Sequence, residues 1–194
     1  MEDALAVDTS TTARSFSGKE LAWWCASFFG FPVGGLVAEA IVGPIDAIWV
    51  AVAAGAIAGL AIGTAQWLVL RAIGIDARWI AFTAAGLALG LGIGVAIFDY
   101  GTSIGDLAVL GAVSGLGVGA AQWVVLRDRV GASFLWIPAI AAFWALGWTI
   151  TTSIGVDVES KWAVFGASGA ITVTLLSGGL LWFLSRLGSG RSAG

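Results

Sequence analysis

Few side chains in this sequence could carry chemistry. Histidine is absent, Cys25 is the single cysteine, and acidic residues number 12 in a chain of 194. The histidine and cysteine clusters that hold zinc, haem or iron–sulfur centres are therefore missing, and no disulfide can form within one chain. No pair of nucleophile and base can be assembled either. The sequence predicts a protein without catalytic activity, metal ion or cofactor.

Glu39 is the only acidic residue inside an otherwise apolar segment, residues 21–43. A charge there is costly inside a membrane and often marks a functional site. Glu39 either belongs to an ion path, or it reaches the outer interface or hydrogen-bonds in protonated form to Ser, Thr or Trp. The sequence leaves these interpretations open.

Gln66 and Gln122 each directly precede a tryptophan near one end of a long apolar segment. Amides at this depth either line a polar vestibule or bond to neighbouring helices. Interhelical bonding is the commoner case, with about 0.6–2 kcal/mol for each bond. The threonines and serines within 149–153 and 172–177 similarly either line a polar path or bond back to their own helix.

Long uncharged segments must position these residues. Hydrophobic residues make up 59% of the chain and charged residues 11%, whereas a soluble domain carries about 25% charged residues. A helix needs about 20 residues to cross the hydrocarbon of a membrane. We predict an all-α membrane protein with six transmembrane helices, at 21–43, 47–70, 77–98, 106–126, 134–155 and 162–185. The transmembrane domain covers 21–187, between a polar tail (1–20) and a short flexible tail (188–194).

The basic residues predict the orientation. With six spans, every lysine and arginine except Lys161 lies on the side of the two termini: Arg14, Lys19, Arg71, Arg78, Arg127, Arg129, Arg186 and Arg191. Because positive residues collect on the cytoplasmic side, we expect a protein of the cell membrane with both termini in the cytoplasm. The acidic outer loops either concentrate cations or are what remains once basic residues are kept inside.

Tryptophans also gather near the helix ends on this side. They are Trp23, Trp24, Trp67, Trp79, Trp123, Trp136 and Trp182. Indole rings favour the membrane–water interface. The sequence therefore predicts an interfacial aromatic belt.

A two-helix unit occurs three times, at about 21–71, 77–127 and 134–186. The strings Gln-Trp-Leu-Val-Leu-Arg at 66–71 and Gln-Trp-Val-Val-Leu-Arg at 122–127 match, and the third copy has Leu181 in place of glutamine. All three share Gly-x3-Trp-x3-Arg, with Gly63, Trp67 and Arg71, then Gly119, Trp123 and Arg127, then Gly178, Trp182 and Arg186.

This spacing has structural consequences. Positions four apart share one helix face, so each copy presents small residues for close packing, ended by tryptophan and arginine. Three tandem hairpins of this kind run parallel, and we predict pseudo-three-fold symmetry about an axis along the membrane normal. Glu39 corresponds to Gly94 and Thr151 in the other copies and is not part of a three-fold ring.

The motif at 66–71, followed by Ala77-Arg-Trp79-Ile and by Gly90, resembles a large group of small, uncharacterised bacterial multi-pass membrane proteins that repeat Gln-Trp-Leu-Val-Leu-Arg. The resemblance covers about 21–186, and the third copy departs from it at Leu181 and Ser185. It implies the fold alone, because no function comes with this group.

Two functional hypotheses follow. The first is an integral membrane scaffold or accessory protein that packs through its glycine-rich faces against itself or other membrane proteins, with lipid or an apolar ligand in the glycine grooves. The alternative is a small channel or transporter for a cation or small solute, lined by Glu39, Gln66, Gln122 and the last two helices. The net charge of −3 and the lack of a basic stripe predict no nucleic-acid partner.

Overall fold

The computed structural model describes residues 16–155 and 166–189, and these residues form helices without a strand. The α-helices are α1 (Gly18–Ala26), α2 (Gly30–Val42), α3 (Ile48–Leu70), α4 (Arg78–Phe98), α5 (Ile104–Leu126), α6 (Trp136–Ser153) and α7 (Ala167–Ser189). Three short 3₁₀ helices join them: η1 (Ser27–Phe29), η2 (Arg71–Ile73) and η3 (Ser133–Leu135). Most of the predicted N-terminal tail, the end of the C-terminal tail, and Lys161 with the predicted helix start at 162 lie outside the described residues.

Six helices among the described residues are long and apolar enough to cross a membrane. They are Gly18–Val42, Ile48–Ile73, Arg78–Phe98, Ile104–Leu126, Ser133–Ser153 and Ala167–Leu187. This confirms the predicted all-α fold with six such helices. The boundaries agree with the charges because a charged residue rarely tolerates hydrocarbon and so stands at a helix end.

The sequence had predicted one continuous helix for the first of these segments, and the structure shows that this is wrong. The segment consists of α1, the 3₁₀ turn η1 and α2. Pro32 explains the break, because a proline ring clashes with the carbonyl four residues earlier, which here belongs to Phe28 in η1. The Ser27 hydroxyl also donates to the Trp24 carbonyl oxygen at 2.7 Å, and such back-bonding bends helices.

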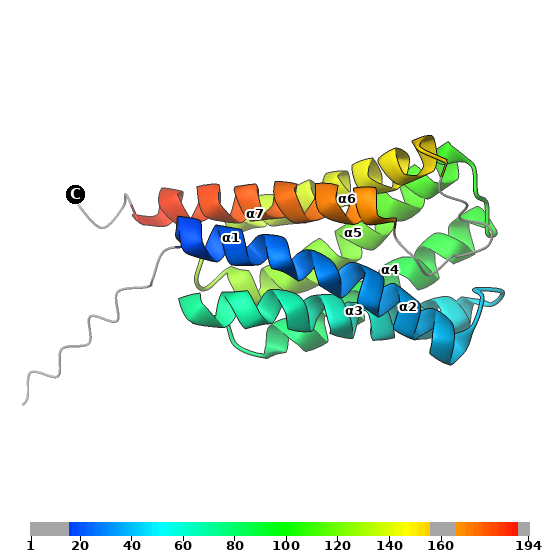
Figure 1. Ribbon diagram of the computed structural model, residues 1–194, viewed down its shortest axis with the longest axis horizontal. Coiled ribbons are helices and arrows are strands. Elements are labelled where there is room, and N and C mark those ends of the chain that lie inside the picture. Colours follow the sequence, from blue (N-terminus) through cyan, green and yellow to red (C-terminus); the bar gives the residue numbers. More distant parts are fainter. Residues whose placement is uncertain (1–15, 156–165, 190–194) are drawn as a thin grey trace, which may run out of the picture.

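The helices pack in chain order and the bundle closes on itself (Figure 1). Each of α2 to α6 contacts the helix that follows it, and α7 returns to contact α1 and α2. The starts of α1, α4 and α6 and the ends of α3, α5 and α7 form one end of the bundle. We call this the terminal end, because both ends of the described chain lie there.

Glycines bring α3 against α4 and α5 against α6. A Cβ atom on Gly59 would lie 2.5 Å from the Ala84 Cα, and one on Gly115 would lie 2.6 Å from the Ile140 carbonyl oxygen. The backbones can approach this closely only where no side chain intervenes. The third such pair, α7 against α1, is packed less extensively, since α7 has Ala170 and Thr174 where α3 has glycines.

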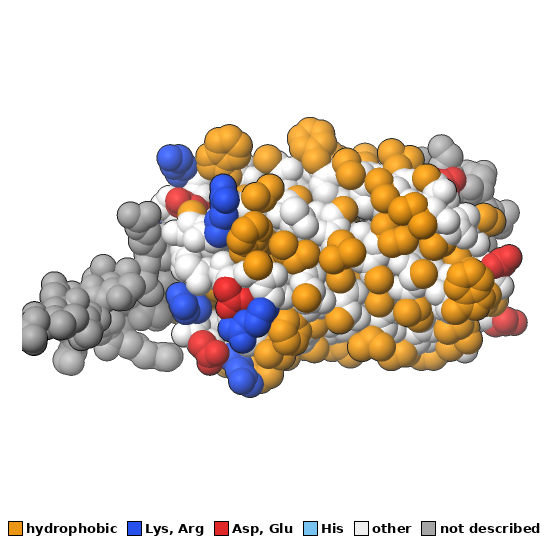
Figure 2. All heavy atoms as spheres, turned by 90° about the horizontal axis from the view of Figure 1, so that it is seen from below, with side chains coloured by type: hydrophobic (Ala, Val, Ile, Leu, Met, Phe, Trp, Pro, Cys, Tyr) orange, Lys and Arg blue, Asp and Glu red, His pale blue; other side chains and the backbone are white. Residues whose placement is uncertain are grey.

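The flank of the bundle is apolar (Figure 2). Exposed side chains there include Ile41, Trp49, Leu89, Ile97 and Phe183. Lysine and arginine side chains gather at the terminal end with acidic side chains among them, whereas the charged side chains seen at the opposite end are acidic. An apolar flank with charged ends is the surface that a helix bundle in a bilayer presents.

Candidate functional site: a buried tryptophan–glutamine network

Three tryptophans, in the last turn of α1 and at the starts of α4 and α6, lie inside the bundle. Trp24, Trp79 and Trp136 each have 0% of their surface exposed. The predicted interfacial belt is therefore wrong for these three residues, because their helix faces turn toward other helices. Trp23 is exposed, and Trp67, Trp123 and Trp182 are half-buried.

Gln66 and Gln122 connect two of these indoles. The Trp79 Nε1–H donates to the Gln66 Oε1 at 3.1 Å, and the Trp136 Nε1–H donates to the Gln122 Oε1 at 2.9 Å. The Gln122 Nε2 donates to the Gln66 Oε1 at 3.1 Å and to the Thr83 Oγ1 at 3.0 Å. These five side chains form one cluster, which we call the polar network, and it links α3, α4, α5 and α6.

The two indoles of the polar network also contact each other. Trp79 and Trp136 meet edge to face, with ring centroids 6.3 Å apart. Deeper in the bundle, Phe31 of α2 contacts Trp144 of α6, with centroids 5.8 Å apart. Gln122 has only 1% of its surface exposed and Gln66 has 6%. Of the two interpretations of these amides, the structure shows interhelical bonding.

Trp24 makes the corresponding contact with α7 through different acceptors. Its Nε1–H is shared between the Thr174 carbonyl oxygen at 3.0 Å and the Ser177 Oγ at 3.2 Å. Leu181 stands where the glutamine would be and offers no acceptor. A Cβ on Gly178 would lie 2.5 Å from the Trp24 Cδ1, so this glycine makes room for the indole.

Glu39 is not part of the polar network. It lies in the last turn of α2, half-buried, at the end of the bundle opposite the terminal end. Gln66 lies on the order of 25 Å away along the axis, at 1.5 Å per helical residue. The Glu39 carboxylate makes no hydrogen bond or ion pair with a described residue. The structure therefore does not bring the three polar residues of the predicted path together.

The other predicted polar groups are mostly occupied within their own helices. Thr149, Thr152 and Thr172 donate to carbonyl oxygens four residues earlier, at 2.8–2.9 Å. Asp106, which the sequence analysis had placed in an acidic outer loop, lies in the first turn of α5 and accepts from the Ser103 hydroxyl and backbone in a capping box. Two buried hydroxyl oxygens, Ser114 Oγ and Thr174 Oγ1, have no hydrogen-bond partner among the described residues.

The Gly-x3-Trp-x3-Arg motifs end in cation–π contacts. The Arg71, Arg127 and Arg186 guanidinium carbons lie 5.8, 5.6 and 3.8 Å from the Trp67, Trp123 and Trp182 ring centroids. Arginine at this spacing stacks on the tryptophan one turn earlier. These pairs cover the terminal end and take no part in the polar network.

The charged loop between α3 and α4 also lies at the terminal end. The Arg78 side chain donates to both Asp76 carboxylate oxygens, at 2.7–3.0 Å. These hydrogen bonds hold the pKa of Asp76 below its usual range. Asp76 is therefore an anion at neutral pH, and it closes the first turn of α4 by accepting from the Arg78 backbone N–H at 2.8 Å.

The chemistry available to the polar network is limited to hydrogen bonding. Its members are amides, indoles and a hydroxyl, none of which gains or loses a proton near neutral pH. Within the described part of the chain, no group of three or more His, Cys, Asp or Glu residues could hold a metal ion. The arrangement can hold helices in register. It also leaves few amide groups free to bind water.

Sequence reasoning identified Gln66 and Gln122 but missed their partners. Trp79 and Trp136 follow these glutamines by 13 and 14 residues, and this near-constant offset was the available signal. Thr83 and Ser177 carried no such signal, because each bonds to a helix distant in sequence.

Comparisons with protein-family models, with curated proteins and with solved structures found no match. The resemblance to multi-pass proteins with the repeated glutamine–tryptophan motif therefore stays a prediction.

Proposed function

We propose that this chain is a non-catalytic multi-pass protein of the cell membrane, a scaffold or accessory protein that transports no solute. The polar network is the observation that carries this proposal. Both amide oxygens and the Gln122 Nε2 are engaged by side chains from neighbouring helices, and the two indoles of the network pack against each other. In a bilayer these hydrogen bonds hold helices together, whereas a solute path needs polar groups that face water.

The glycine faces support a refined form of the scaffold hypothesis. Gly59 of α3 and Gly115 of α5 pack against α4 and α6 of the same chain. These glycines are therefore occupied within the chain and unavailable to a partner protein. A partner or a second copy would instead contact the outward apolar faces, as the lipid bilayer does.

We infer that the three hairpins are copies arranged with pseudo-three-fold symmetry. The indoles of Trp24, Trp79 and Trp136 support this, because each donates to the helix that ends the preceding copy. The pairs are α7–α1, α3–α4 and α5–α6, so each joins one copy to the next around the bundle.

The orientation with both termini in the cytoplasm is also a proposal. It is supported by the lysines and arginines at the terminal end, seen in Figure 2, because positive residues are retained on the cytoplasmic side.

One observation favours the alternative, a small channel or transporter for a cation or small solute. The first membrane segment is interrupted by η1, and interrupted helices are common at transport sites. The half-buried Glu39 of the same segment would then be the residue on the path.

A flux assay separates the two functions. Purified wild-type protein in liposomes is tested for movement of K⁺, Na⁺, H⁺ and a small neutral solute, beside Glu39→Gln and a matched control, Asp46→Asn, which alters an exposed carboxylate near the same end. We expect the flux of protein-free liposomes in all cases. Flux that Glu39→Gln abolishes and Asp46→Asn leaves intact would establish transport and overturn the scaffold proposal.

A further inference from the structure

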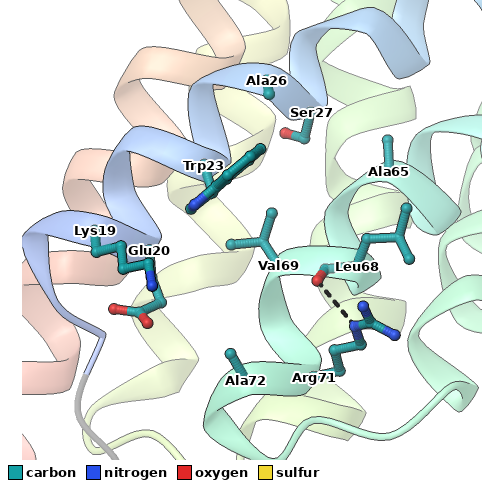
Figure 3. Close-up of a pocket in the computed structure, with 10 residues that line it drawn as sticks. All are labelled: Lys19, Glu20, Trp23, Ala26, Ser27, Ala65, Leu68, Val69, Arg71 and Ala72. Atoms are coloured by element: carbon teal, nitrogen blue, oxygen red, sulfur yellow. Dashed lines mark hydrogen bonds between the residues drawn. The ribbon is translucent and has the colours of Figure 1, made fainter.

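A groove of about 550 Å³ separates the start of α1 from the end of α3 (Figure 3). Trp23 lies on the side of α1 that faces α3, and Val69 points toward it. Leu68 lies in the last turn of α3, and Arg71 is the first residue of η2. Lys19 completes the lining from the first turn of α1. The groove therefore has an apolar floor and basic residues from both helices.

The two basic side chains of the groove are available to a ligand. Lys19 and Arg71 are exposed. Arg71 gives its Nε–H to the Leu68 carbonyl oxygen at 3.3 Å, while its Nη groups and the Lys19 Nζ form no hydrogen bond or ion pair with a described residue. An arginine fork and a lysine ammonium are the side chains that bind phosphate.

Glu20, the single acidic residue among the described residues that line the groove, is engaged elsewhere. The Glu20 carboxylate accepts from the Ser17 backbone N–H at 3.0 Å and from the Ser17 hydroxyl, which forms the capping box of α1. The charge of the lining remains positive, with two cations against this one anion. A ligand that fits the groove is apolar along its length and anionic at the terminal end.

A second pocket at the terminal end has a different composition. It measures about 370 Å³ and is lined by Trp123, Arg127, Val130 and Phe134, so that it has one cation. Arg127 also has a carboxylate beside it, since its Nε lies 3.8 Å from the Asp128 Oδ1. Arg127 therefore provides a matched control for Arg71: the same motif position, without a second cation.

We propose that the α1–α3 groove binds one anionic phospholipid from the leaflet at the terminal end. Its phosphate lies at Lys19 and Arg71, and an acyl chain lies along Trp23, Leu68 and Val69. The charge of the lining and its position among the other basic residues carry this proposal. It depends on the proposed membrane insertion but not on the absence of transport, and a transporter could hold the same lipid.

Native mass spectrometry of the detergent-solubilised full-length protein tests the headgroup. Dioleoyl phosphatidylglycerol and dioleoyl phosphatidylcholine are titrated separately. Each basic residue contributes about fivefold to the affinity for an anionic lipid. We therefore expect phosphatidylglycerol to bind about 25-fold more tightly than phosphatidylcholine, and the Lys19→Gln/Arg71→Gln protein to lose most of this preference. Equal binding of the two lipids to the wild type, or an equal loss in Arg127→Gln, would overturn the proposal.

A second pair of variants tests whether the lipid occupies the groove. Ala26 lines it and is exposed, so Ala26→Trp fills it, whereas the exposed neighbour Cys25 is not part of the lining. We expect Ala26→Trp to lower the affinity for phosphatidylglycerol at least tenfold and Cys25→Trp to leave this affinity unchanged. Equal affinities for these two variants would show binding to a charged surface and contradict a groove site.

Discussion

Gln122 makes more hydrogen bonds within the polar network than any other of its members. It accepts from Trp136 and donates to Gln66 and Thr83, so one amide connects α5 to three helices. A buried polar group left without a partner costs about 1–3 kcal/mol. The loss of stability on removing Gln122 therefore comes mainly from the neighbouring polar groups that lose their hydrogen-bond partner.

Gln122→Leu tests this penalty, and it introduces the residue type found at Leu181. We expect the free energy of unfolding to fall by about 2 kcal/mol, measured by SDS titration of the protein in mixed micelles. The main cause is the Trp136 Nε1–H, which loses its acceptor inside the core.

A double-mutant cycle identifies this cause. Trp136→Phe removes the indole N–H, so Gln122→Leu should cost less in that background than in the wild type. Equal costs in both backgrounds would mean that the two side chains are not coupled.

The sequence predicted part of this residue-scale chemistry. It anticipated interhelical bonding for Gln66 and Gln122 because amides inside a bilayer rarely find water. It placed Trp24, Trp79 and Trp136 at the interface because indoles favour that region in general. Which face of each helix turns inward depends on how the helices pack, and the local sequence does not determine it.

At the scale of helices, close glycine contacts connect one predicted hairpin to the next. Gly59 lies against Ala84 of α4, and Gly115 lies against Ile140 and Ala141 of α6. The spacing of the glycines correctly predicted that these helix faces pack closely against another helix. It could not predict which helix fills that face. Pro32 is the sequence feature that could have predicted the 3₁₀ turn in the first segment.

Gly59→Ala should separate α3 from α4. The new methyl carbon would lie 2.5 Å from the Ala84 Cα, which is backbone and cannot rotate away. Overpacking of this kind costs about 1–3 kcal/mol, measurable in the same SDS titration.

Gly179→Ala is the matched control for that substitution. Gly179 lies on the exposed face of α7, and a Cβ there meets no atom within 4 Å. We expect no loss of stability and a gain of up to about 1 kcal/mol from the better helix former. A Gly59→Ala protein as stable as this control would refute close packing between α3 and α4.

At the scale of the whole molecule, the described residues form a closed bundle with an apolar flank and with lysine and arginine side chains gathered at the terminal end. The number of long apolar helices was predictable because the membrane thickness sets their length. The predicted three-fold arrangement implies a closed bundle. The hydrogen bonds that close it were not predictable, because the α7–α1 contact uses Trp24, Thr174 and Ser177 in place of the repeated glutamine.

Protease protection of epitope tags tests the orientation. We expect tags at the N- and C-termini to be cleaved in inside-out vesicles and protected in right-side-out vesicles, because the basic residues near both stay in the cytoplasm. A tag inserted after Asp46, at the opposite end, should show the reverse. Termini cleaved in right-side-out vesicles would contradict the proposed topology.

Access of water to the polar network tests the central claim most directly. Thr83 is fully buried and bonds to Gln122, and a cysteine there is close to threonine in size. In a Cys25→Ser background, Thr83→Cys is treated with a membrane-impermeant thiol reagent in inside-out vesicles, beside Ala77→Cys in the exposed loop at the start of α4. We predict rapid labelling of Ala77→Cys, and labelling of Thr83→Cys only after SDS unfolds the protein. Comparable labelling of both in the folded protein would show a water-filled vestibule and contradict the closed bundle.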